Sequence, residues 1–114
     1  MSDTNSETTV FIPDLAALAE NVAPDSIVSR TVVRNARARI IVFGFAPGQE
    51  LSEHTAAKSA MLQFIRGTAT LTLGDEVREV EAGAFAYMPP NLPHSIVAHT
   101  ETVMALVMLE APGA

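Results

Sequence analysis

The sequence contains no cysteine, which excludes disulfide bonds, thiol nucleophiles, zinc fingers and iron–sulfur clusters. Any metal ion that this protein binds must therefore be held by nitrogen or oxygen atoms. Long apolar stretches are also missing. The two longest runs, 40–46 and 103–109, have seven residues each, whereas a helix that crosses a bilayer needs about 20. We therefore expect no membrane-spanning segment and no membrane partner.

Basic residues are scarce as well. Seven Lys and Arg stand against 13 Asp and Glu, which gives a formal net charge of −6 at pH 7. An acidic chain repels phosphate backbones, so nucleic acid is not an expected partner. The polar, acidic start of the chain lacks the basic and apolar regions of a secretory signal, and we expect the protein to be cytoplasmic.

What remains is the composition of a globular protein, with 48% hydrophobic residues in a chain of 114. That length suits one hydrophobic core, and we expect a mobile N-terminal lead over residues 1–10 and a single domain over 11–114. Within that domain, Asp14 is placed to cap a short helix from Asp14 to Glu20, with Leu15 and Leu18 at helical spacing.

From residue 27 onward, β-branched and aromatic runs alternate with turn residues, which is typical of strands. Gly74-Asp75 is a hairpin turn signal between two such runs. The predicted strands are 27–33, 39–45, 61–66, 68–73, 76–80, 84–88, 94–98 and 102–109. This many short strands predict an all-β barrel or jelly roll.

Two segments combine a leading glycine with a later histidine, and their spacing resembles the two motifs of the cupin family. The six matching residues are Gly48, His54, Gly67, Gly83, Pro89 and His94. The resemblance covers residues 27–109 and implies the family's double-stranded β-helix. In a typical cupin, three histidines and one glutamate hold a divalent metal such as manganese, iron, nickel or zinc inside the barrel.

Several positions depart from the family pattern. Ala56 and Ala60 stand where the family has its second histidine and its glutamate, and Ala98 replaces the final asparagine. Asn91 replaces a glycine. Of the four metal ligands that the resemblance implies, the chain keeps His54 and His94.

Replacement ligands lie near in the sequence. Gln63 could supply a carbonyl oxygen as a third ligand, although strand alternation from an inward Ala60 turns it outward unless a bulge intervenes. Glu50 and Glu53 come shortly before His54. His99 follows His94 by five residues, so its parity is opposite, and we interpret it as a surface residue.

The replaced positions remove bulk and charge from the barrel interior, so we expect a roomy, apolar pocket. Its predicted lining is Ala56, Ala60, Tyr87 and Ala98. Four arginines, Arg30, Arg34, Arg37 and Arg39, recur in the first predicted hairpin. We interpret them as a solvated face, with anion binding as the alternative.

These features lead to the hypothesis of a small-molecule-binding protein in which His54 and His94 hold a divalent ion that the ligand helps to coordinate. The alternative is a metal-dependent oxygenase or isomerase that acts on a small organic acid or phenolic compound. A third reading is a metal-free sensor or carrier. We expect a homodimer, because single-domain cupins usually pair through the barrel and the strand 103–109 adds apolar surface.

Overall fold

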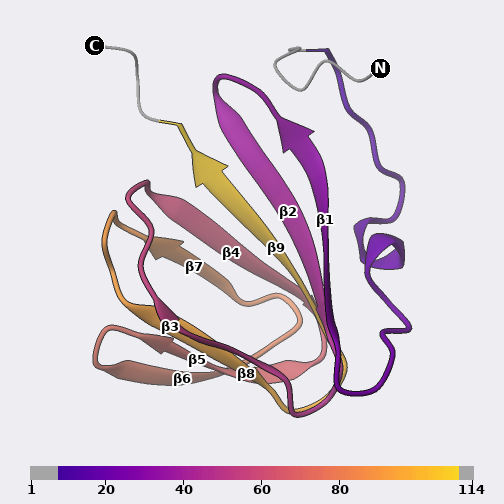
Figure 1. The fold of residues 1–114 in the computed structure, drawn as a ribbon, viewed down its shortest axis with the longest axis vertical. Helices are drawn as coiled ribbons and strands as arrows, with labels where there is room; N and C mark the ends of the chain where they lie inside the picture. Colours follow the sequence, from indigo (N-terminus) through magenta and orange to yellow (C-terminus); the bar gives the residue numbers. More distant parts are fainter. Residues whose placement is uncertain (1–7, 111–114) are drawn as a thin grey trace.

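The computed structural model describes residues 8–110, which form two β-sheets after an N-terminal segment (Figure 1). The nine strands within these residues are β1 Ile27–Arg34, β2 Ala38–Phe45, β3 Glu50–His54, β4 Ala60–Arg66, β5 Thr68–Leu73, β6 Glu76–Glu81, β7 Phe85–Met88, β8 His94–Ala98 and β9 Thr102–Leu109. The larger sheet has the order β1-β2-β9-β4-β7 and the smaller one β3-β8-β5-β6. Every pairing is antiparallel, as in a jelly roll.

The predicted all-β class is confirmed. All eight predicted strands are present, with bounds that differ by at most one residue, and Gly74-Asp75 forms the predicted turn. The N-terminal helix is shorter than predicted: it is a 3-10 helix, η1 Leu15–Leu18, because Ala19 already has an extended φ of −142°. Residues 1–7 of the predicted mobile lead lie outside the described residues. No helix in the described part of the chain has the length and hydrophobicity of a membrane span.

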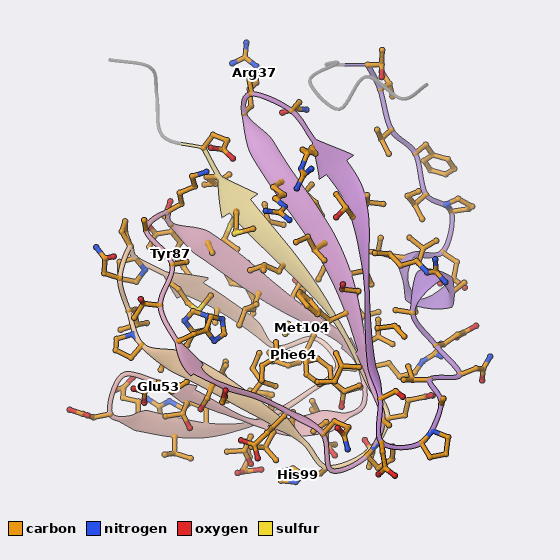
Figure 2. The ribbon with its side chains drawn as sticks, in the orientation of Figure 1. Arg37, Glu53, Phe64, Tyr87, His99 and Met104 are labelled. Atoms are coloured by element: carbon orange, nitrogen blue, oxygen red, sulfur yellow. The ribbon has the colours of Figure 1, made fainter. Side chains whose placement is uncertain are left out.

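The core lies between the two sheets. Directly paired residues of an antiparallel ladder lie on the same face, so the register separates inner from outer side chains. Phe64, Met104 and Ile96 are each 1% exposed and belong to the inner cluster. Figure 2 shows Phe64 and Met104 between the sheets, whereas His99 points away from them at the lower edge.

The sheets meet at one end of the molecule and diverge at the other (Figure 1). At the meeting end, the Gly48 amide donates to the carbonyl oxygen of Ala98 (2.8 Å). We call the opposite end, formed by residues 35–37, 55–59, 74–75 and 89–93, the wide end. Four backbone hydrogen bonds join its segments: Glu110 N to Arg37 O (2.9 Å), Leu109 N to Ser59 O (3.1 Å), Asn91 N to Ala56 O (2.7 Å) and Gly74 N to Pro93 O (2.8 Å).

The N-terminal segment packs on the outer face of the larger sheet. Ala16 and Ala19 are buried against Val42 and Val103. Gly44 permits this approach, because a Cβ at that position would lie 1.9 Å from the Ala19 carbonyl oxygen. At its end the segment is held by Arg66, which donates to Glu20; this hydrogen bond is the main cause of a raised pKa for Arg66. The segment therefore covers part of the outer face and does not enter the space between the sheets.

Candidate functional site at the wide end

The two motif histidines lie side by side at the wide end. His54 on β3 pairs directly with His94 on β8, and their ring centroids are 4.1 Å apart with an interplanar angle of 59°. His94 is 7% exposed, and His54 is exposed at its edge. Residues from distant segments thus meet at a place that solvent reaches.

A bulge in β3 turns His54 toward the interior. Leu51 pairs with Ile96 and His54 pairs with His94, so β3 has two residues between these pairs where β8 has one. Strict alternation from the inward Leu51 would have turned Glu53 inward and His54 outward. The extra residue reverses this, and Glu53 is exposed.

Backbone carbonyls fix the orientation of both imidazoles. The Nδ1 atom of His54 is 2.8 Å from the Ser52 carbonyl oxygen, and that of His94 is 2.9 Å from the Leu92 carbonyl oxygen. Because a carbonyl oxygen only accepts hydrogen bonds, Nδ1 is the protonated nitrogen in both rings. Each neutral ring therefore offers Nε2 as an acceptor or a metal ligand, which is the usual arrangement of a metal-binding histidine.

Apolar side chains form the inner surroundings of the pair. Ala60 pairs with Met88 and Met108 across the larger sheet, and Leu73 pairs with His94 in the smaller one. Ala60 is 2% exposed, in agreement with the inward position expected for it. Ala98 is fully buried nearer the meeting end, and Ala56 lies in the loop after His54, where its carbonyl accepts from Asn91.

Two predicted site residues lie elsewhere. Tyr87 is 55% exposed on the outer face, because Met88 and Ala86 take the inner positions of β7. Gln63 pairs with Phe85 on that outer face, and its amide donates to the Ala84 carbonyl (3.2 Å). The positions of Tyr87 and Gln63 therefore do not support the pocket-lining and ligand roles predicted for them.

His99 has the surface position predicted for it. Its Nε2 atom lies 2.6 Å from the Thr70 hydroxyl and 3.2 Å from Glu79, on the outer face of the smaller sheet. This leaves His54 and His94 as the histidine pair of the interior.

The interpretation of the arginines as a solvated face needs a correction at Arg39. Arg39 is half-buried and pairs with Met108, so it starts on the inner face of the larger sheet. Arg34 pairs with Arg39 but is exposed, as expected for a solvated residue. Arg30 pairs with the outward Val42 and donates to the Leu18 carbonyl. Hairpin composition alone did not separate these cases, but counting alternate positions back from Phe45 and Phe43 would have done so.

The donor set suits part of a metal coordination sphere. Two Nε2 atoms of adjacent imidazoles suit ions such as zinc, nickel, iron or manganese, with metal–nitrogen distances of about 2.0–2.1 Å for zinc. Within residues 8–110, however, no group of three or more His, Cys, Asp or Glu side chains is placed to hold a metal ion. The chain thus offers two protein ligands, and water or a bound molecule would have to supply the others.

Sequence comparison agrees with this architecture. A family model described as the cupin domain matches residues 41–110, which is more than half of the chain. The protein is a cupin. The matched region of this cupin contains both histidines. A search of curated proteins finds no match to the sequence.

Solved structures show the same fold. A conserved protein of unknown function from Streptococcus pyogenes is 29% identical, with 99% of this cupin and 98% of that chain covered and a TM-score of 0.83. A cupin superfamily protein from Desulfitobacterium hafniense is 17% identical (96% and 97% covered, TM-score 0.80). Salicylate 1,2-dioxygenase from Pseudoaminobacter salicylatoxidans, solved with gentisate adducts, is 16% identical (76% and 26% covered, TM-score 0.69). A region of the same fold thus occurs in a protein that was solved with a small molecule.

Proposed function

We propose that this cupin binds a small molecule at the wide end, where His54 and His94 hold a divalent ion and the bound molecule completes the coordination. The observation that carries the proposal is the pair of Nε2 atoms, on rings 4.1 Å apart, that have no hydrogen-bond partner among residues 8–110. The apolar residues around the pair, Ala60, Met88 and Leu73, suit a ligand with an apolar body. When bound, the ion would act as a Lewis acid toward an oxygen or nitrogen of the ligand.

Binding, rather than catalysis, is the function that we propose. A two-histidine oxygenase site normally adds a carboxylate on the same face as the imidazoles. Glu50 and Glu53 are exposed on β3, and the described residues contain no three-ligand group. The oxygenase alternative therefore lacks the carboxylate ligand on which it depends.

Metal loading tests this proposal. Protein purified without chelator and then dialysed against nickel, zinc, iron or manganese should retain about one equivalent of at least one of them per chain, because two preoriented imidazoles give the ion an anchored site. Elemental analysis by mass spectrometry gives the stoichiometry. Retention of less than about a tenth of an equivalent of every ion would rule out a metal-based function.

We also propose that this cupin forms a homodimer through the uncovered part of the outer face. Ile40, Val107, Met61 and Tyr87 form one row across four strands, and Phe85 beside them is 59% exposed. Because the chain carries a net charge of −6, two copies repel each other except where uncharged surfaces meet. A self-complementary uncharged patch on a two-fold axis suits such a contact.

Light scattering at micromolar concentration should give the mass of a dimer. Tyr87→Glu, which places a charge in the centre of the patch on both copies, should shift the mass to that of a monomer while the circular dichroism spectrum stays the same. A wild-type monomer, or a Tyr87→Glu dimer of unchanged stability, would contradict this interface.

A further inference from the structure

The wide end of the larger sheet carries two arginines on adjacent strands. Arg34 and Arg39 are directly opposite in the β1–β2 ladder, where side chains of one face have Cβ atoms about 4.5–5.5 Å apart. Like charges in such a pair repel. Within residues 8–110, neither arginine forms an ion pair with an acidic side chain, and Glu110, whose amide bonds to Arg37 at the same end of the sheet, pairs with Lys58 instead (2.6 Å).

Arg39 also carries a buried donor that the described residues do not satisfy. Its Nε atom is screened from solvent and has no hydrogen-bond partner among them. A buried polar atom normally has a hydrogen-bond partner, and leaving it unpaired destabilises the fold. An acceptor for this Nε–H would have to come from outside the described residues.

The register directs this arginine toward the same interior that the histidines line. Arg39, Met108, Ala60 and Met88 form the outermost inner row of the larger sheet. His54, His94 and Leu73 form the outermost inner row of the smaller sheet. The loops 55–59 and 89–93 both pass from one sheet to the other at the wide end and are joined by the hydrogen bond from Asn91 N to Ala56 O, so the row of Arg39 and the row of the histidines face each other at this end.

We infer that Arg39, with Arg34 beside it, binds the carboxylate of the ligand, so that the ligand is a small organic acid whose apolar body lies between Arg39 and the two histidines. This inference rests on the proposed function and specifies its ligand class. A guanidinium matches a carboxylate in plane and spacing, and its Nε–H and Nη–H groups form two parallel hydrogen bonds with the two carboxylate oxygens. Neutralisation of the guanidinium pair then favours the acid over a neutral analogue of the same shape.

The probe pair is benzoate and benzamide, which share an apolar ring and differ in charge. Titration followed by NMR chemical shifts should show that the wild-type protein binds benzoate about tenfold or more tightly than benzamide. Arg39→Gln should weaken benzoate binding by a similar factor and leave benzamide binding unchanged. Arg34→Gln should have a smaller effect, and Arg37→Gln, at the exposed turn of the same hairpin, serves as the matched control with no effect.

A second variant separates ligand binding from a structural role. Arg39→Met keeps the length of the side chain and removes the unsatisfied donor, so it should raise the thermal midpoint by about 4 °C while it abolishes the preference for benzoate. If Arg39 only covered Met108 with its aliphatic stem, Arg39→Met would leave benzoate binding at the wild-type level, and this result would overturn the inference. Failure of the wild-type protein to prefer benzoate would also overturn it.

Nickel binding, measured on the same proteins, distinguishes this inference from the proposed function. Arg39→Gln should bind nickel with wild-type affinity, whereas His54→Ala should not bind it. Nickel binding without a preference for benzoate would contradict the inference that the ligand is an acid, and it would support the two-histidine metal site. If the protein binds none of the metals but prefers benzoate in a way that depends on Arg39, the inference of an acidic ligand would stand and the proposed metal site would be contradicted.

Discussion

Replacing Gly67 by alanine is expected to lower the free energy of unfolding by about 4 kcal/mol, a large part of the stability of a small protein. Two effects combine at this position. Gly67 has φ +90°, a conformation that costs residues with a Cβ about 1–3 kcal/mol. A Cβ would also lie 2.2 Å from the Glu101 carbonyl oxygen and 2.8 Å from Thr102 Cα, which are backbone atoms that cannot rotate away. Chemical denaturation measures the difference.

Gly83→Ala is the matched control for this prediction. Gly83 has a similar φ of +101°, but a Cβ there would have nothing within 4 Å. In this variant the free energy of unfolding should therefore fall only by the conformational cost of about 1–3 kcal/mol. If the two variants were equally stable, the close packing of Gly67 against the start of β9 would contribute nothing to stability, and the prediction would be wrong.

Removal of His54 or His94 is expected to weaken metal binding at least about 100-fold, because loss of a hydrogen bond that merely orients a ligand already costs about 10–100-fold. In the wild-type protein, metal at 100 times its dissociation constant should stabilise the fold by about 2.7 kcal/mol and so raise the thermal midpoint by about 10 °C. His54→Ala and His94→Ala should lose this shift.

His99→Ala provides the control, since it removes a histidine that contacts Thr70 and Glu79 on the outer face. It should keep the full metal-induced shift. His94 is buried, so its removal also disturbs packing, whereas the exposed His54 can be removed with less effect on the metal-free protein. An undiminished shift in His54→Ala would show that the metal is bound at another place.

Most of the fold follows from local patterns, and one missed strand shows where those patterns fail. β5 and β9 have clear apolar character, and their bounds were predicted correctly. β3 has a single apolar side chain, Leu51, so it carries no alternating signal. Its strand conformation comes instead from hydrogen bonding to β8.

The sequence predicts the part of the site that depends on the spacing of the motif residues. It does not predict the part that depends on which face of a strand each side chain occupies. The distances from Gly48 to His54 and from Gly83 to His94 were sufficient to bring the histidines together. Tyr87 was assigned to the wrong side because an aromatic residue in a short strand has two possible orientations, and only the neighbouring Met88 decides between them. Arg39 was grouped with surface arginines because composition does not reveal which rows of a ladder face inward.

The bulge in β3 accommodates one extra residue without moving the histidine pair. Deleting one residue between Leu51 and His54 would leave one residue between the two pairs on β3, as on β8, and regular alternation would still place His54 opposite His94. We therefore expect homologous chains that are one codon shorter at this point to keep the pair on a regular strand in place of the bulge.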